Sequence, residues 1–203
     1  MEKLRLEFFD RNDIVQEIGP FRGLYITRAA DKDIRANSQH GGTVTALVEL
    51  AMKEGFLDAA VMTHSGGGLS PTGMLVFRPG DVRQCSGSSF QIPPTLAVLN
   101  EALREGKYRK IGVVGTPCKT LAVYKMKKMF LDGNDRRADS IGIVFGLFCG
   151  WGIGWEGLEK LVKTKICSEK LKRIDIPPSK YQIMELCTGD GRIEIPLDEV
   201  YPI

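Results

Sequence analysis

The chain has 203 residues, of which 43% are hydrophobic and 26% are charged, and its formal net charge is +3. This ordinary composition argues against intrinsic disorder, collagen-like repeats and a disulfide-rich scaffold, and so small a positive excess indicates no nucleic-acid partner. No apolar run reaches the ~18–20 residues of a membrane helix, and the N-terminus lacks the apolar stretch of a secretory signal. We therefore expect a cytoplasmic protein without a membrane span.

Glycine and proline residues divide the chain into short apolar runs that alternate with helical patterns. The apolar runs predict strands at residues 21–27, 57–62, 73–78, 110–115 and 140–149. The helical patterns lie at residues 43–53, 93–105, 154–166 and from residue 116 onward. The tail predicts short strands at residues 172–176, 181–187 and 192–195, with a hairpin turn at 189–191.

The order of these elements predicts an α/β fold. Strands that alternate with helices form βαβ units and a largely parallel or mixed sheet flanked by helices. The tail adds a small antiparallel strand region at the C-terminal end. Because the sequence has no internal repeat, low-complexity stretch or flexible linker, we expect residues 1–203 to form a single compact unit.

The first candidate site is the helix entrance at residues 38–45. In α/β sheets, ligands bind where the carboxyl ends of strands lead into helix N-termini. Gly41 and Gly42 precede the predicted helix, where bare backbone N–H groups can approach an anion. Thr43 and Thr45 add hydroxyl donors. The spacing is not a dinucleotide-binding fingerprint, and a glycine-assisted turn with threonine capping explains it equally well.

Two cysteines mark the other candidate positions. Cys118 lies in the first turn of a predicted helix, where the helix dipole and Lys119 would stabilise a thiolate. It is a candidate reactive thiol or metal ligand, although a buried small hydrophobic residue is the alternative. Cys149 ends the predicted strand at 140–149. If the strands before the two thiols are parallel neighbours, both thiols emerge at one edge and suit a metal or iron–sulfur site; packing of Cys149 beside the tryptophans is the alternative.

The remaining cysteines and the histidines give weaker signals. The chain has 5 cysteines without a CxxC pair and 2 histidines, which favours neither disulfides nor a histidine-rich zinc site. We interpret Cys167 and Cys187 as structural residues that face the core, and Cys85 has no assigned role. A cysteine nucleophile at Cys118 would need a histidine to activate it, and His40 is the candidate.

Four stretches together resemble the coenzyme F420 hydrogenase/dehydrogenase beta-subunit family. They are residues 38–47 followed by 54–61, the GTPC motif in 113–119, the Gly-Leu-Phe-Cys ending of 141–149, and 87–90 with Pro93. In the last of these, Phe90 stands where the family has tyrosine. The order and separations agree over roughly residues 20–200, with about 20–80 resembling the family's N-terminal part and 81–203 a truncated C-terminal part.

The resemblance implies a flavoprotein oxidoreductase subunit for electron transfer, possessing FAD and a 4Fe–4S cluster and exchanging a hydride with coenzyme F420 as substrate. Its partners would be the catalytic or iron–sulfur subunits of a hydrogenase, a formate dehydrogenase or a related redox complex. The cofactor-binding residues would be Gly41, Gly42, Thr43, Thr45, Gly87, Ser88, Thr116, Cys118 and Lys119. Cys118 and Cys149 would serve the cluster. Because the flavin carries the hydride chemistry, no side chain is expected to act as a catalytic acid or base.

One departure from the family pattern affects the cluster. In the family a CxxC stretch follows the region that matches residues 194–201, and this chain ends at Ile203 before any such pair. Four thiolates usually hold a 4Fe–4S cluster, so we expect that this chain does not assemble one alone. The chain is truncated, has lost the cluster, or relies on a partner to complete it. The alternative function is a non-catalytic docking or assembly subunit of a larger redox complex.

Overall fold

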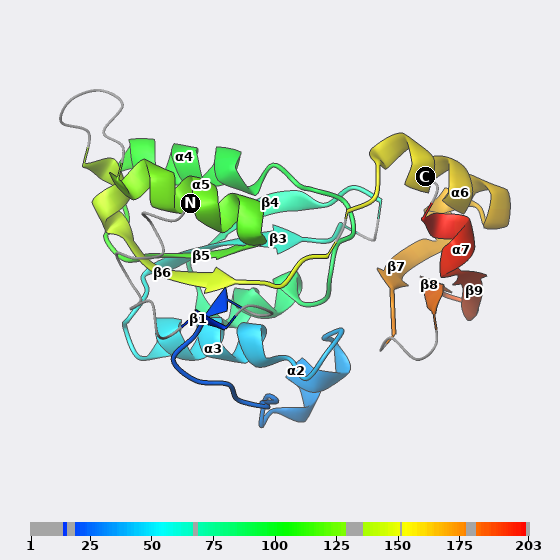
Figure 1. Ribbon diagram of the computed structural model, residues 1–203, viewed down its shortest axis with the longest axis horizontal. Coiled ribbons are helices and arrows are strands. Elements are labelled where there is room, and N and C mark those ends of the chain that lie inside the picture. The colour runs from blue at the N-terminus through cyan, green and yellow to red at the C-terminus, as the bar shows by residue number, and fades with distance from the viewer. Residues whose placement is uncertain are drawn as a thin grey trace.

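A computed structural model gives the arrangement of the chain (Figure 1). It describes residues 14–15, 19–66, 69–128, 136–150, 152–177 and 182–201. In these residues the strands form a four-stranded mixed sheet, a three-stranded antiparallel sheet and a two-stranded pair of β1 (Ile14–Val15) and β2 (Gly19–Pro20). The predicted fold class, a mixed sheet flanked by helices with a small antiparallel region near the C-terminus, is confirmed.

The four-stranded sheet has the order β4-β3-β5-β6. Its strands are β3 (Ala59–His64), β4 (Thr72–Val76), β5 (Ile111–Gly115) and β6 (Ile141–Gly146). Strands β3, β5 and β6 are parallel, and β4 is antiparallel to β3. Every residue of β5 is buried, as expected of a central strand covered on both faces.

Helices cover both faces of this sheet (Figure 1). Helix α3 (Thr43–Lys53) packs Val48 against one face, in a cluster with Met62 and Val114. Helices α4 (Thr95–Glu105) and α5 (Pro117–Lys128) cover the other face, where Leu99 and Val123 meet Val113. Successive side chains of a strand point to opposite faces, so the apolar runs of β3 and β5 supply both clusters.

The connections bring three helix N-termini to one edge of the sheet. Helices α3 and α4 run directly into β3 and β5, so each helix starts near the edge where the parallel strands end. Helix α5 follows β5 and starts at the same edge. Figure 1 shows this edge on the side toward which the arrows of β3 and β6 point. We call it the carboxyl edge.

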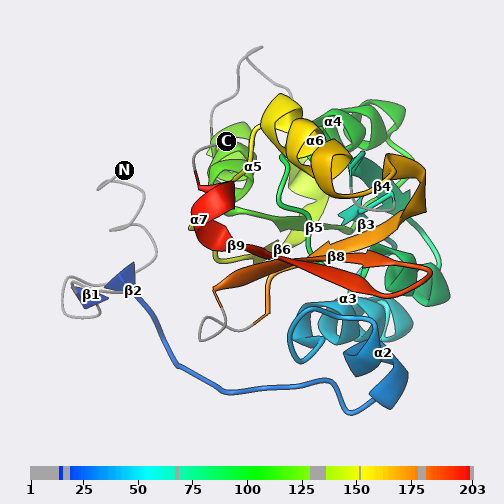
Figure 2. The same ribbon diagram turned by 90° about the vertical axis from the view of Figure 1, so that its right-hand side faces the viewer.

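The C-terminal elements pack around a second core beyond the carboxyl edge (Figure 2). They are α6 (Trp155–Lys165), the 3-10 turn η4 (Ser168–Lys170), β7 (Leu171–Asp175), β8 (Ile183–Thr188), β9 (Arg192–Pro196) and α7 (Leu197–Val200). The predicted turn at 189–191 joins β8 and β9, with the Thr188 N–H donating to the Gly191 carbonyl at 2.8 Å. The Gln39 Nε2 donates to the Ile176 carbonyl at 3.0 Å and connects this region to the segment before α3.

Several short elements were not predicted. Besides β1, β2, η4 and α7, they are α2 (Lys32–Ala36) and the 3-10 helices η2 (Pro79–Cys85) and η3 (Arg137–Ser140). Helix α2 begins at Asp31, whose side chain accepts hydrogen bonds from the backbone N–H groups of Asp33 and Ile34. This aspartate cap is a signal that the sequence carried.

The predicted strand at 21–27 is wrong. These residues are extended but belong to no regular element, and Leu24, Tyr25 and Ile26 are exposed. An apolar run forms a strand only beside a partner that satisfies its backbone groups, and no strand in the described part of the chain pairs with this one.

Two residues used in the sequence predictions lie outside the described residues. They are Trp151, beside which Cys149 would pack in the alternative interpretation, and Tyr181, the expected start of a strand. None of the described helices has the length and apolar character needed to cross a membrane.

Candidate functional site

The entrance to α3 is shaped by two glycines. Gly42 has a φ of 74°, the left-handed region that favours glycine, and a Cβ there would lie 2.8 Å from Ile34 Cγ2. The Gly41 carbonyl accepts from the Ala29 N–H at 2.7 Å, which fixes the turn from its other side. In the described part of the chain, no side chain caps the first turn of α3. Its N–H groups are therefore left for another acceptor.

The two threonines of this motif differ in their surroundings. The hydroxyl of Thr43 is hydrogen-bonded to that of Thr27 at 2.9 Å. Thr43 therefore connects the extended segment before α2 to the start of α3. Thr45, also in the first turn of α3, is buried, with 7% of its surface exposed.

The turn from β5 into α5 holds the GTPC motif. The Thr116 carbonyl accepts from the N–H groups of Lys119 and Thr120 at 3.0 and 2.9 Å, which starts the helix. The Thr116 hydroxyl and the Cys118 thiol are hydrogen-bonded at 3.3 Å. Cys118 is exposed, so the alternative that it fills the core as a small hydrophobic residue is wrong.

Lys119 connects the starts of α4 and α5. Its side chain is buried, and its Nζ donates to the Thr95 hydroxyl at 2.6 Å. Burial lowers the pKa of Lys119, and the charges of Cys118 and Cys149 act in the opposite direction. Both sulfurs thus lie close enough to interact electrostatically with one ammonium. A positive charge held in a low-dielectric setting at the carboxyl edge suits an anionic ligand.

Cys118 and Cys149 leave neighbouring parallel strands. Gly115 of β5 is in register with Gly146 of β6, and each cysteine follows its glycine by three residues. The expectation that Cys149 ends the strand is wrong, because β6 stops at Gly146 and Cys149 lies in an exposed irregular segment beyond it. The Leu147 N–H still donates to the Gly115 carbonyl at 2.9 Å, which keeps the two exits side by side.

The described residues supply too few ligands for a complete cluster. Among them, no group of three or more His, Cys, Asp or Glu side chains is placed to hold a metal ion. Cys118 and Cys149 are two thiols at one edge, whereas a 4Fe–4S cluster usually takes four thiolates. This donor set does not fit a 4Fe–4S cluster held by the described part of the chain.

The motif with Gly87 and Ser88 lies in the segment between η2 and α4. Gly87 has a φ of 95°, and Ser88 is half-buried. The neighbouring Phe90 carbonyl accepts from the Ile153 N–H at 2.8 Å. Since Ile153 follows Cys149 in the chain and α4 starts at the carboxyl edge, this motif lies near the same edge as the other two.

The remaining cysteines have different environments. Cys85 is buried, its Sγ donates to Met74 Sδ at 3.7 Å, and burial raises the pKa of the Cys85 thiol to about 11. The expectation that Cys167 faces the core is wrong, because this residue is exposed just before η4. Cys187 on β8 is half-buried.

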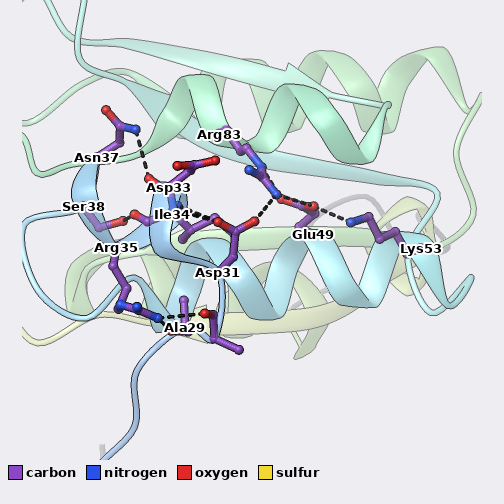
Figure 3. A network of polar contacts seen from close by, with 11 residues as sticks. Ala29, Asp31, Asp33, Ile34, Arg35, Asn37, Ser38, Glu49, Lys53 and Arg83 are labelled. Carbon is purple, nitrogen blue, oxygen red and sulfur yellow. Dashed lines mark hydrogen bonds and ion pairs between the residues drawn. The ribbon is translucent and has the colours of Figure 1, made fainter.

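Sequence reasoning missed a polar network that supports α3 (Figure 3). Glu49 has 4% of its surface exposed and accepts from Arg83 Nε at 2.9 Å and from Lys53 Nζ. The Nη2 of Arg83 also donates to Asp31 Oδ2 at 2.8 Å. These ion pairs join α2, α3 and η2. Of these pairs, Glu49 and Lys53, four residues apart on one helix, gave a sequence signal. Arg83 follows Glu49 by 34 positions, a spacing that has no local signature.

The hydrogen bonds from Arg83 lower the pKa of Glu49 more than burial raises it. The pKa of Asp31 is also lowered, chiefly by the backbone N–H groups of Ile34 and Asp33 that it caps. Both carboxylates are therefore held in their charged forms.

Two family models match almost the whole described chain. Residues 24–100 match the N-terminal model of "Coenzyme F420 hydrogenase/dehydrogenase, beta subunit", and residues 108–202 match the model for the C terminus of that same protein. Coenzyme F420 hydrogenase subunit beta of Methanothermobacter thermautotrophicus is 25% identical over 91% of this chain and 65% of its own length. The protein of the same name from Methanococcus voltae is 29% identical over 81% of this chain and 59% of its own length.

The fold agrees with a solved complex. A chain in the structure of the F420-reducing [NiFe] hydrogenase complex from Methanosarcina barkeri superposes with a TM-score of 0.75 and 25% identity, over 86% of this chain and 60% of that one. This chain thus spans about three-fifths of the length of these relatives. The resemblance that the four sequence motifs indicated is confirmed. The chain belongs to the coenzyme F420 hydrogenase/dehydrogenase beta-subunit family.

Proposed function

We propose that this chain is a flavin-dependent electron-transfer subunit that binds FAD at the carboxyl edge and exchanges a hydride between FAD and coenzyme F420. The observation that carries the proposal is the convergence of three helix N-termini and the GTPC turn at one edge of the sheet. Family membership supports the choice of a flavin and F420 over other anionic ligands.

The residues at the α3 entrance fit a diphosphate. A diphosphate needs hydrogen-bond donors and positive charge, and the uncapped first turn of α3 offers backbone N–H groups with the positive end of the helix dipole. A glycine at position 42 allows the left-handed turn into α3 and the close approach of α2, against which a Cβ would lie 2.8 Å from Ile34 Cγ2. Thr43 and Thr45 follow within the first turn. We assign the FAD diphosphate to Gly41, Gly42, Thr43 and Thr45.

The other motifs are assigned to the remainder of the cofactor. FAD, when bound, supplies the hydride chemistry, and the protein positions it and excludes water. Lys119 would lie beside the ligand with its Nζ anchored by Thr95, and a bound anion would favour its charged form against the burial that lowers its pKa. Gly87, Ser88 and Thr116 lie in the two segments that lead into α4 and α5 and would contact the cofactor from there.

No electron-transfer step is assigned to a 4Fe–4S cluster in this chain. Cys118 and Cys149 remain a proposed pair of metal ligands, with further ligands from outside the described residues. After anaerobic reconstitution of the full chain alone, we expect clearly fewer than about four irons per chain, since about four thiolates are needed. Iron and sulfide assays measure this directly. About four of each per chain, abolished by Cys85→Ser, would mean that a cysteine outside the matched motifs completes the site.

The partners follow from the same proposal. Relatives are named as subunits of coenzyme F420 hydrogenase and of F(420)H(2) dehydrogenase, the latter from Methanosarcina mazei at 29% identity over 85% of this chain and 47% of the relative. We propose that this chain works beside the catalytic or iron–sulfur subunit of a hydrogenase, a formate dehydrogenase or a related redox complex.

The visible spectrum of the anaerobically purified full chain tests the proposed function. We expect flavin bands, FAD as the nucleotide released on denaturation, and bleaching of the bands when reduced coenzyme F420 is added. A colourless protein that takes up no added FAD, yet co-purifies with a redox partner, would contradict the proposal and favour the docking or assembly role.

A further inference from the structure

The segment of residues 86–94 encloses polar atoms that lack partners. Gln91 has 3% of its surface exposed, and neither its Oε1 nor its Nε2 has a hydrogen-bond partner among the described residues. The buried hydroxyl of Ser86 is in the same condition. Buried polar side chains in folded proteins are almost always paired, so an amide with both ends unpaired calls for an explanation.

Lack of partners is not a general property of the polar residues buried here. Glu49, with 4% of its surface exposed, has both carboxylate oxygens paired by Arg83 and Lys53. Lys119, with 7% exposed, is bonded to Thr95. Among the described residues, Ser168 Oγ and Asp175 Oδ1 in the C-terminal elements also lack partners. Gln91 differs from them because both ends of its amide are buried and unpaired.

The backbone contacts of this segment place it at the carboxyl edge. Four residues after Gln91, Thr95 starts α4 and accepts the hydrogen bond from Lys119 in the GTPC turn. One residue before Gln91, the Phe90 carbonyl accepts from the Ile153 N–H, in the segment that follows Cys149. The residues that flank Gln91 are thus hydrogen-bonded to both segments that carry the thiols.

We infer that Gln91 recognises the ring of the coenzyme bound at the carboxyl edge. A primary amide presents an acceptor oxygen beside a donor nitrogen. The pyrimidine edge shared by flavin and deazaflavin rings presents alternating carbonyl and N–H groups, which such an amide matches with two hydrogen bonds. This inference rests on the proposed function and adds a ring-binding residue to it.

Recognition requires the segment 86–94 to change conformation. Both amide atoms are enclosed by protein, so the ring reaches them only when the segment opens. The residues from Ser86 to Pro94 belong to no helix or strand, so opening breaks no sheet ladder. It does break the bond from the Ile153 N–H to the Phe90 carbonyl, and the bound coenzyme has to offset that loss. The coenzyme favours the open conformation because it pairs the amide there, which is the differential affinity that a conformational change needs.

The test compares Gln91→Met with the matched control Gln84→Met in the full chain. Gln84 is an exposed glutamine on η2 whose Nε2 donates to Asp81 Oδ1 at 3.1 Å. FAD and coenzyme F420 are titrated separately, and Tm is measured without added coenzyme. For Gln91→Met we expect an unchanged or higher Tm, because an unpaired buried amide is replaced by an apolar chain of similar length. We also expect about tenfold weaker binding of the coenzyme whose ring Gln91 contacts.

Weaker binding of FAD alone assigns Gln91 to the flavin, and weaker binding of F420 alone assigns it to the deazaflavin. The control should keep both affinities. The inference is overturned if Gln91→Met binds both coenzymes as the wild type does, or if its Tm falls, since a fall would mean that the amide is paired. Misfolding of both Gln91→Met and Gln91→Leu also overturns it. If the wild-type protein binds neither coenzyme, the proposed function itself is overturned. This outcome is distinguishable from failure of the inference, in which the wild type binds and Gln91→Met binds equally well.

Discussion

Two consecutive helices begin in opposite ways. Helix α2 starts at Asp31, whose carboxylate accepts from two backbone N–H groups, whereas α3 starts at Gly42 with no side-chain cap. Below its uncapped start, α3 is held firmly by the pairing of Glu49 with Arg83 and Lys53. The same helix therefore combines a buried carboxylate whose two oxygens are both paired with a first turn that has no side-chain cap. A rigid support with unfilled donors is the arrangement that an anion-binding site requires.

The largest effect is expected at the start of α3. Gly42→Val places a β-branched residue at a left-handed φ of 74° and a Cβ 2.8 Å from Ile34 Cγ2. If the FAD diphosphate binds there as we propose, distortion of the entrance removes several charge-assisted hydrogen bonds, and FAD affinity should fall at least about 100-fold. Equilibrium dialysis against FAD, with far-UV circular dichroism to verify folding, measures this.

Gly55→Val is the matched control at the other end of α3. Gly55 also has a left-handed φ, of 72°, but a Cβ there meets nothing within 4 Å. The backbone strain should cost about 1–3 kcal/mol in either variant. Only Gly42→Val should lose FAD. Full flavin occupancy in folded Gly42→Val would show that the diphosphate does not bind at the α3 entrance.

The next effect is expected in the support below the helix. Arg83→Met leaves the buried Glu49 carboxylate with Lys53 alone and removes the bond to Asp31. Loss of a partner from a buried carboxylate lowers the free energy of unfolding. Thermal unfolding should show a clearly lower Tm than for Arg78→Met, whose exposed guanidinium lies over the Phe77 ring. Equal Tm values for the two variants would show that the network is not a support.

Acid should weaken the same network. The pKa of Glu49 is lowered from its ordinary value of 4.5, mainly by Arg83, and that of Asp31 from 3.8, mainly by backbone N–H groups. A carboxylate with a lowered folded-state pKa adds stability above its unfolded pKa, and this stability is lost as the pH falls through the folded value. Tm should hold between pH 7 and about 5 and fall below about 4.5. If the Tm of Arg83→Met falls as steeply with decreasing pH as that of the wild type, the acid sensitivity does not come from the pairing of Glu49 with Arg83.

The smallest effect concerns thiol reactivity. Cys118, Cys149 and Cys167 are exposed, whereas Cys85 is buried with its pKa raised to about 11 by burial. A thiol-specific reagent should label the three exposed cysteines quickly in the folded protein and Cys85 only on unfolding. Peptide mapping by mass spectrometry identifies the labelled residues. Early labelling of Cys85 would contradict the packing of η2 against α3 and β4.

The sequence predicted the individual helices and strands better than how they come together at the carboxyl edge. The bounds of α3 were predicted correctly because Gly42 and Gly55 delimit a clear apolar periodicity. The strand predicted at residues 21–27 was wrong because strand formation depends on a pairing partner, which local sequence patterns do not reveal. The motif residues could be named from the sequence. That Gly115 and Gly146 are in register, which sets Cys118 beside Cys149, is a property of strand order that local patterns do not contain.

The supporting network was hidden for the same reason. Arg83 follows Glu49 by 34 residues and Asp31 by 52, and neither spacing has a local signature. The unpaired amide of Gln91 is likewise invisible in the sequence, where this residue is one glutamine among several. Which polar side chains find a partner far along the chain, and which remain buried without one, is decided by the tertiary fold.

Hydrogen–deuterium exchange of the full chain with and without FAD tests most directly whether the cofactor binds at the carboxyl edge, because it shows which backbone segments the bound cofactor protects. We predict that FAD slows exchange at the α3 entrance around residues 42–46, in the segment leading into α4 and in the GTPC turn. These three stretches are far apart in sequence and share the carboxyl edge. Protection confined to the C-terminal elements β7, β8 and β9, or no protection at saturating FAD, would contradict this prediction.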